Sequence, residues 1–538
     1  PTGAAYDFQT GKDIGRYYVA DNVGVSDNNT TNYKTQLNGR LQYETTIAQN
    51  HNIGAMFVYS EEYWHTRSTG ASRNDRIHPS TSEINSALTN VQSNSGSSAS
   101  EGLRSYIGRM NYSAYDKYLL EFSFRVDGSS KFIKGHQYGF FPTVAVGWRF
   151  TEEEFLKKYL SSWLSSGKLR ASWGKLGDNS GVGRFEQLET LTAMNYMSSD
   201  VVKGFVNKKM INKDLSWEVS TDINVGLDLG FLNNRLRTEI DFYNRLRTGM
   251  NRPSQMSIHL TGAYSAPRAN IGDLLNRGLE LNLTWKDKIG NVEYSVNLNG
   301  AYNRTVLKEW NEFLSRGWVY LDMPYHFLYV YENNGIAQTW QDIYNNTPQG
   351  LSPSDVIRKD LNGDGIIDGK DKKAYPNIQR DRPTTTYGIT LQAAWKGFDI
   401  SMLFNGGLGR KDFWLTDFNN TAFADRRYAS TWDHWTEPWS LENRGGEWPR
   451  LGTSTDRSDN SYWLYNMNYL RMKNIMLGYN LPKKLLSKIS MTNLRIYASA
   501  ENLFTVTQYP GLDPEKKNSA RDLYPINRSF SIGLNVSF

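Results

Sequence analysis

Hydrophobic and polar residues alternate along much of the chain with a period of two. The longest example covers residues 215–231, where apolar side chains and one threonine occupy the odd positions, from Leu215 to Phe231, and Ser, Glu, Asp, Asn and Gly the even ones. Strict alternation of this kind predicts a β-strand with one apolar and one polar face. Strands of globular proteins usually have about 5 to 6 residues, whereas a tilted membrane-spanning strand needs about 9 to 11. The length therefore favours the wall of a barrel.

The same pattern recurs in pairs separated by very short connections, which predicts antiparallel hairpins. One follows the turn at Asn233-Asn234, and others flank residues 289–290 and 396–397. The sequence indicates an all-β fold, a large antiparallel transmembrane β-barrel. About sixteen candidate strands are predicted in this chain, beginning near residues 14, 33, 52, 103, 118, 138, 167, 215, 234, 277, 291, 384, 398, 468, 493 and 526.

The predicted connections alternate between tight and long. Tight ones fall at 49–51, 116–117, 232–234, 289–290 and 396–397, and long ones at 67–102, 177–214, 249–276, 306–383 and 407–467. Outer-membrane barrels have short periplasmic turns and long extracellular loops. No fixed internal period is found, which disfavours a soluble β-propeller.

The last residues, 530–538, alternate strictly and end on Phe538. A final amphipathic strand with a C-terminal aromatic residue resembles the signal that barrel-assembly machinery recognises, although an ordinary edge strand would show the same alternation. The pattern predicts a set of lipid-facing side chains: Val219, Ile223, Leu227, Phe530, Leu534 and Val536.

Composition agrees with a barrel and excludes other classes. The mean hydropathy of −0.60 is low, as expected when polar lumen residues and loops offset a lipid-facing band. No run approaches the roughly 18 apolar residues of a spanning helix. The absence of cysteine excludes disulfides, and a net charge of +6 without basic blocks implies no nucleic acid. The chain opens at Pro1 with neither an initiator Met nor a signal segment, so we expect a fragment covering residues 1–538 of the barrel portion.

Several motifs resemble the SusC/RagA family of TonB-dependent transporters of Bacteroidetes. They are Gly167-Lys-Leu-Arg-Ala-Ser-Trp-Gly174, Gly177-Asp-Asn179, Leu215-Ser-Trp-Glu218, Arg277-Gly-Leu-Glu280, Trp395-Lys-Gly-Phe-Asp399, Tyr469-Leu-Arg-Met-Lys473, Leu477-Gly-Tyr-Asn-Leu-Pro482, Ala500-Glu-Asn-Leu-Phe504 and Tyr509-Pro-Gly-Leu-Asp-Pro514. The resemblance implies a nutrient importer in the outer membrane of a Gram-negative bacterium, with a plugged barrel of about 22 strands.

The same resemblance implies the partners. They are TonB, acting through an N-terminal part with the plug and first strands, and a SusD-like surface lipoprotein, with dimers of such pairs as a further expectation. This chain departs from the family pattern in two ways: it shows neither a plug nor a TonB-contacting segment, and it has about six strands too few. Because an isolated sheet in lipid would leave two open edges, we expect the remaining strands to exist in the complex.

A calcium-loop pattern lies within the long connection 306–383. Residues 360–371 match the spacing of an EF-hand loop, with Asp360, Asn362 and Asp364 at positions 1, 3 and 5. The carbonyl of Ile366 would fill position 7, Asp368 would act through water, and Asp371 replaces the usual glutamate at position 12. This predicts a structural calcium ion; the alternative is a metal-free polar turn.

The connection 407–467 is rich in tryptophan: Trp414, Trp432, Trp435, Trp439 and Trp448. Indole faces suit stacking on sugar rings, so Trp432, Trp435 and Trp439 are predicted substrate contacts. The alternative, which we favour, is packing within the loop's own core or against a partner.

No catalytic motif is found, and the chain is predicted not to be an enzyme. The leading function is TonB-dependent import of an oligosaccharide, with a peptide as the substrate of a RagA-type importer as the alternative. A passive porin and a secreted β-rich glycan-binding protein remain the other candidates. Ligand specificity is expected to lie in the loops and the lipoprotein, which the strand pattern does not reveal.

Overall fold

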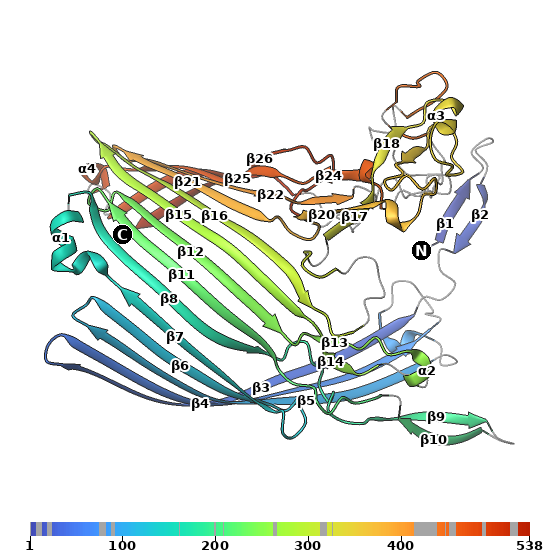
Figure 1. Ribbon diagram of the computed structural model, residues 1–538, viewed down its shortest axis with the longest axis horizontal. Helices are drawn as coiled ribbons and strands as arrows, with labels where there is room; N and C mark the ends of the chain where they lie inside the picture. Colours follow the sequence, from blue (N-terminus) through green and yellow to red (C-terminus); the bar gives the residue numbers. More distant parts are fainter. Residues whose placement is uncertain are drawn as a thin grey trace.

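The computed structural model describes residues 2–6, 13–18, 24–74, 82–87, 92–160, 162–197, 201–207, 209–261, 266–312, 320–324, 327–413, 438–446, 448–450, 459–486, 491–516 and 526–538. Its main feature is a 15-stranded antiparallel sheet in which every strand pairs with its neighbours in chain order. Figure 1 shows that this sheet curves strongly. The strands are β3 (Val25–Ile47), β4 (His51–Arg73), β5 (Gln92–Ala114), β6 (Tyr118–Ser129), β7 (Tyr138–Trp148), β8 (Leu164–Asp178), β11 (Glu218–Phe231), β12 (Leu236–Thr248), β15 (Asp273–Ile289), β16 (Val292–Glu309), β21 (Thr385–Trp395), β22 (Phe398–Leu408), β25 (Tyr469–Asn480), β26 (Asn493–Thr507) and β27 (Ser529–Ser537).

Small elements fill the connections. Six two-stranded pairs are formed by β1 (Thr2–Tyr6) with β2 (Asp13–Tyr18), β9 (Leu191–Met197) with β10 (Val201–Asn207), β13 (Asn251–Pro253) with β14 (Arg268–Asn270), β17 (Phe327–Tyr331) with β20 (Lys372–Gln379), β18 (Asn333–Ile336) with β19 (Val356–Arg358), and β23 (Lys411–Phe413) with β24 (Leu464–Asn466). Short helices are α1 (Glu154–Leu160), α2 (Ile258–Thr261), α3 (Trp340–Tyr344), α4 (Lys483–Leu486), η1 (Ile84–Ser86), η2 (Phe150–Glu152), η3 (Gly369–Asp371) and η6 (Ser461–Trp463). Among the described residues, none of the helices has the length and apolar character needed to cross a membrane.

All five predicted tight turns are confirmed, and they lie at one end of the sheet, here named the turn end. The turn between β11 and β12 places Leu232, Asn233 and Asn234 at φ values of 52°, 58° and 61°, a conformation that asparagine tolerates better than most residues. The long connections gather at the opposite end, the loop end (Figure 1). The last strand, β27, pairs antiparallel with β26 and runs toward the turn end.

The sheet has one apolar and one polar face, and the apolar face is exposed. Of the predicted lipid-facing residues, Ile223, Phe530, Leu534 and Val536 are exposed, while Val219 and Leu227 are partly exposed. Over the described part of the chain, two buried hydrophobic clusters are found, and both lie at the loop end without covering this face. A continuous exposed apolar surface on one face of a long antiparallel sheet is the arrangement that lipid stabilises.

Aromatic residues line the apolar face at the turn end. Trp285 donates its indole N–H to Tyr294 Oη over 3.1 Å. The rings of Phe398 and Tyr479 lie 4.4 Å apart, and those of Trp163 and Phe231 stack at 5.8 Å. Such a belt is typical of the boundary between lipid tails and water.

Two strand predictions were wrong in position. The candidate near residue 14 is β2, which pairs with β1 outside the main sheet. The connection predicted at 67–102 is shorter, because β4 continues to Arg73 and β5 begins at Gln92. The added segments are rich in Ser, Thr, Gly and Asn, and they lack apolar alternation because they extend past the apolar band. Within the described residues, β3 and β27 are the free edges of the sheet.

Candidate functional site

The polar face of the sheet carries ion pairs between strands that are adjacent or separated by one strand. Arg170 on β8 contacts two carboxylates: its guanidinium donates to Asp228 on β11 over 2.7–3.0 Å and to Asp241 on β12 over 2.9–3.0 Å. Arg495 on β26 pairs with Asp399 on β22, across the intervening strand β25. Arg170 thereby satisfies two carboxylates that would otherwise repel one another across the ladder. The wall is thus held by charge pairs while staying polar toward the interior.

Amide side chains continue this polar face over β15 and β16. Asn297 donates to Asn282 Oδ1 over 2.7 Å and to Thr284 Oγ1 over 2.8 Å. Asn303 donates to Tyr243 Oη over 2.7 Å and to Asn276 Oδ1 over 3.0 Å. Neutral amides offer both donors and acceptors, so this region suits a ligand or a partner surface rich in hydroxyl or amide groups.

An open cavity of about 820 Å³ lies on the wall toward the turn end. Its lining includes Glu44, Glu121, Lys168, Arg170 and Asn224. The cavity combines both signs of charge with amides and contains no cysteine. This combination of charged and amide groups fits the recognition of a polar ligand.

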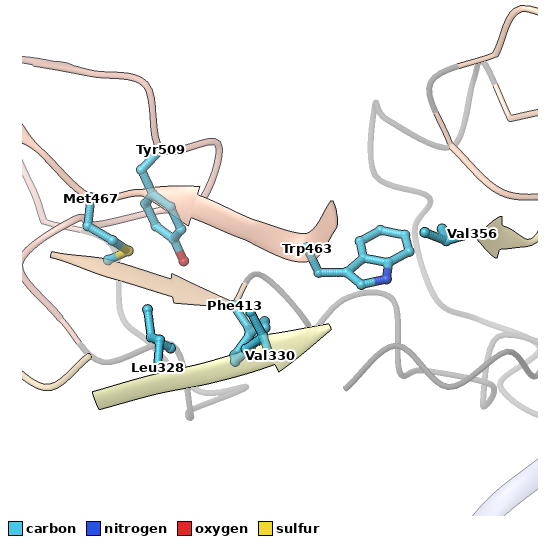
Figure 2. Close-up of a cluster of buried hydrophobic side chains, with 7 residues drawn as sticks. All are labelled: Leu328, Val330, Val356, Phe413, Trp463, Met467 and Tyr509. Carbon is cyan, nitrogen blue, oxygen red and sulfur yellow. The ribbon is translucent and has the colours of Figure 1, made fainter. Parts of the chain in front are cut away.

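Two of the long connections at the loop end form a common structure, here named the cap, made of the described parts of residues 327–380, 409–413, 438–450 and 459–468. Its core consists of Leu328, Val330, Val356, Phe413, Trp463, Met467 and, from the β26–β27 connection, Tyr509. Figure 2 shows these side chains in a row that runs from Met467 and Tyr509 at one end to Val356 at the other. The cap is therefore a small folded unit with its own apolar centre.

The segments 306–383 and 407–467, predicted as two separate loops, are joined within the cap. The backbone N–H of Tyr331 donates to the Asp459 carbonyl over 2.7 Å. Asn333 donates its N–H to Ser461 Oγ over 3.0 Å, and Lys372 pairs with Asp459 at 3.0 Å. The two connections consequently present one surface at the loop end.

Two buried arginines, which the sequence did not single out, fix the β26–β27 connection to the cap and wall. Arg410 donates to the carbonyls of Pro514, Glu515 and Lys516 over 3.0–3.1 Å. Arg471 on β25 pairs with Asp513 and Glu515, each at 2.8 Å. A buried guanidinium is stable only when its donors are satisfied, so these contacts hold residues 513–516 against the sheet. The sequence did hold one signal for Arg471: it occupies a polar position on a strand whose apolar and polar residues alternate.

The predicted calcium loop forms a series of turns closed by carboxylates. Asp360 accepts hydrogen bonds from the N–H groups of Gly363 and Gly365 over 2.7 and 2.8 Å. Both glycines have positive φ, 73° and 80°. Asn362 and Asp364 accept from the N–H groups two residues further on, each over 3.0 Å. The side-chain oxygens of the first half of the loop thus hold its backbone in successive turns.

Asp371 closes the same loop from inside. Its side chain is fully buried and accepts N–H bonds from Asp368 over 2.8 Å and from Leu361 and Asn362 over 2.9 and 3.4 Å. These bonds, that of Asp368 first, lower the pKa of the Asp371 carboxyl, while burial opposes them. Because the folded pKa is depressed, this contribution to stability is present above pH of about 4 and is lost only below it. Three backbone N–H groups thus share the two oxygens of the Asp371 carboxylate.

The remaining predicted loop ligands are peripheral. Asp368 accepts from the Lys370 N–H over 2.7 Å, and the Lys370 ammonium lies 3.7 and 3.8 Å from Asp364 and Asp368. The side chain of Ile366 is exposed. Over the described ranges, no three His, Cys, Asp or Glu side chains converge into a preformed metal site. The segment 360–371 nevertheless contains four aspartates and only one lysine, so its net charge is negative.

The structure describes two of the five tryptophans, Trp439 and Trp448, and does not test the predicted role in substrate binding. Trp414, Trp432 and Trp435 lie outside the described residues. Trp439 is 7% exposed and donates its indole N–H to Gln338 Oε1 over 2.8 Å, and Trp448 stacks on Trp463 at 6.3 Å. Both therefore pack inside the cap, as the alternative interpretation expected, and a substrate role for Trp432, Trp435 and Trp439 stays a prediction.

Comparison with known proteins gives a consistent family. The family model described as TonB dependent receptor-like, beta-barrel, matches residues 2–349. The TonB-dependent receptor P3 of Formosa agariphila is 30% identical over 476 residues, which are 81% of this chain and 45% of that protein. The TonB-dependent receptor SusC of Bacteroides thetaiotaomicron is 30% identical over 456 residues, 81% of this chain and 44% of that protein. The chain spans about half the length of the curated relatives it matches.

Solved structures show the same fold. The RagAB peptide transporter superposes with a TM-score of 0.79 at 22% identity, covering 95% of this chain and 56% of that chain. The RagAB peptide importer in the closed-closed state gives a TM-score of 0.78 at 23% identity, with the same coverage. At these identities the likeness concerns the fold.

Proposed function

The chain belongs to the family of TonB-dependent receptor-like β-barrels, and from this premise we propose that it forms the barrel wall of an importer that takes up oligosaccharides. TonB-dependent receptors are outer-membrane transporters, not enzymes. The observation that carries the proposal is the chain-ordered 15-stranded sheet, apolar outside and polar inside, with tight turns at one end and the cap at the other. In a Gram-negative outer membrane the turn end would face the periplasm.

The free edges of β3 and β27 support a larger assembly. Unpaired backbone groups in lipid cost several kcal/mol each, so an open sheet is unstable there. We propose that further strands, to a total of about 22, close the barrel. A plug would then occupy the lumen against the polar face, and TonB would act through that plug.

The cap is the proposed docking surface for a SusD-like lipoprotein, and two such pairs would form a dimer. Its two connections present one continuous surface, and long ordered connections of this kind are usually functional. The β9–β10 hairpin also projects at the loop end (Figure 1) and exposes Leu191, Met194, Tyr196, Val202 and Phe205. These apolar side chains support contact with a protein partner.

An oligosaccharide is proposed as the substrate because the polar face is rich in neutral amides. The Asn297 and Asn303 networks offer paired donors and acceptors to hydroxyl groups. Peptide uptake is the second candidate, favoured by the likeness of the fold to the RagAB peptide transporter. Amides also bind peptide groups, so uptake measurements decide between the two.

Uptake by cells that carry the complete transporter tests the proposal. Labelled oligosaccharides and labelled peptides would be offered to wild-type cells, to cells without this gene and to cells without TonB. We expect oligosaccharide uptake to fall to background in both mutants, because import is powered through TonB. Uptake that persists without TonB would indicate a passive porin, and loss of peptide uptake alone would contradict the substrate.

We also propose that the loop 360–371 binds one calcium ion through Asp360, Asn362, Asp364, the Ile366 carbonyl and Asp371, with Asp368 acting through water. The support is the oxygen-only donor set, the excess of aspartate over lysine and the turns at Gly363 and Gly365. The role would be structural. Tyr329 on β17 donates its hydroxyl to the Gly369 carbonyl over 3.0 Å, which connects the loop to the β17–β20 hairpin of the cap.

A further inference from the structure

The connection between β7 and β8 differs from the tight turns around it. It contains η2 and the seven-residue helix α1, Glu154–Leu160, at the turn end of the sheet (Figure 1). On α1, Phe155 and Tyr159 lie one turn apart, and Leu156 and Leu160 lie beside them. Lys157 and Lys158 occupy the opposite side. The helix is thus amphipathic, and at this length it would be marginal in water by itself.

Both ends of this connection are fixed to the apolar face of the sheet. Before the helix, Glu153 accepts hydrogen bonds from Tyr118 Oη and, over 3.3 Å, from Trp148 Nε1. Tyr118 and Trp148 are paired residues on the outward side of β6 and β7. After the helix, Trp163 stacks on Phe231 at 5.8 Å. The helix is therefore held on the side of the sheet that faces lipid in the proposed barrel.

The exposed side chains of α1 continue that lipid-facing surface. Phe155 is 64% exposed, Tyr159 75% and Trp163 49%, while Leu156 and Leu160 are half-buried. Lys157 and Lys158 are exposed on the other side. Aromatic residues with neighbouring lysines are the composition of helices that lie in a membrane interface.

We infer that α1 is an interfacial anchor, with Phe155, Tyr159 and Trp163 inserted into the periplasmic leaflet and Lys157 and Lys158 bound to anionic phospholipid headgroups. This inference rests on the proposed barrel and its orientation. A second segment supports it: α4 follows Pro482 at the same end of the sheet, with Lys483 and Leu485 exposed. Two basic, apolar segments thus interrupt the turns at the end that faces this leaflet.

The absence of native cysteine in this chain makes site-specific labelling practical. In the complete transporter, reconstituted in vesicles, a bimane label would be attached to Phe155→Cys, Tyr159→Cys or Glu154→Cys. We expect lipids brominated near the headgroup to quench the labels at 155 and 159, and aqueous iodide to quench the label at 154. In the Tyr159→Cys background, K157Q with K158Q should lower the preference for brominated phosphatidylglycerol over phosphatidylcholine by roughly fivefold per lysine.

Two further labels distinguish a failure of the anchor inference from a failure of the proposed barrel. Phe242→Cys reports the strand wall, and Phe205→Cys on β10 reports the loop end. If the Tyr159 label is as accessible to iodide as the Phe205 label while lipid quenches the Phe242 label, the anchor is wrong and the barrel stands. Iodide access at Phe242 would overturn the barrel and the anchor together. Equal quenching by both lipids in the chain with native lysines would overturn the headgroup assignment.

Discussion

Replacing Val225 by arginine is expected to destabilise the barrel by about 2–4 kcal/mol and to reduce the amount assembled in the outer membrane. Val225 is 45% exposed on the apolar face and pairs with Phe242 and Ala171. It lies six residues from Phe231 in the turn-end aromatic belt, which at a 45° tilt is about 14 Å along the membrane normal. A guanidinium there would enter the middle of the hydrocarbon layer. Denaturant unfolding in lipid vesicles and heat-modifiable migration of the complete transporter measure the effect.

The neighbouring residue supplies the control. Asn224→Arg adds the same charge on the polar face, where Asn224 lines the open cavity near Arg170. This variant should stay within about 0.5 kcal/mol of the native protein. If both variants lose stability equally, or if Val225→Arg assembles normally, the assignment of the two faces is wrong.

Removing calcium is expected to increase the rate of amide hydrogen exchange in residues 360–371 about 100-fold. With a Kd of about 0.1 mM, in the range of extracellular modules, 10 mM calcium would stabilise the loop by about 2.7 kcal/mol. The amides of Gly363 and Gly365, which bond to Asp360, should respond most. Exchange followed by mass spectrometry, with calcium and with chelator, measures the difference.

Matched variants locate the effect. Asp360→Ala removes a proposed ligand and should abolish the calcium dependence, whatever it does to the metal-free loop. Asp322→Asn changes an exposed carboxylate paired with Lys308 outside the loop and should keep the full dependence. Identical exchange of the native loop with calcium and with chelator would refute the site.

The period-two pattern identified the wall because lipid on one side and polar surroundings on the other constrain every second residue. It failed where that constraint ends. The loop-end parts of β3, β4 and β5, such as Gln92–Ser100 on β5, are paired strands with polar side chains on both faces. Their pairing depends on backbone bonds, which leave no signature in hydrophobicity.

The cap was less predictable because its order comes from contacts distant in sequence. Val330 and Trp463 share one core although 133 residues separate them. The calcium-loop pattern could be found in the sequence only because all its proposed ligands lie within twelve consecutive residues. Arg410 resembled a surface arginine in sequence, and its three carbonyl partners at 514–516 appear only in the folded chain. A long connection rich in aromatic residues indicated a functional loop, but not that two such loops fold together.

Cysteine accessibility along β11 tests the central claim most directly. Single cysteines at residues 222–229 of the complete transporter, assembled in outer membranes, would be treated with a charged, water-soluble thiol reagent and with a lipid-soluble one. The account predicts strict alternation: Asp222, Asn224, Gly226 and Asp228 react with the water-soluble reagent, and Ile223, Val225, Leu227 and Leu229 with the lipid-soluble one. Uniform reaction with the water-soluble reagent at all eight positions would contradict the claim that this strand is part of a membrane-spanning wall.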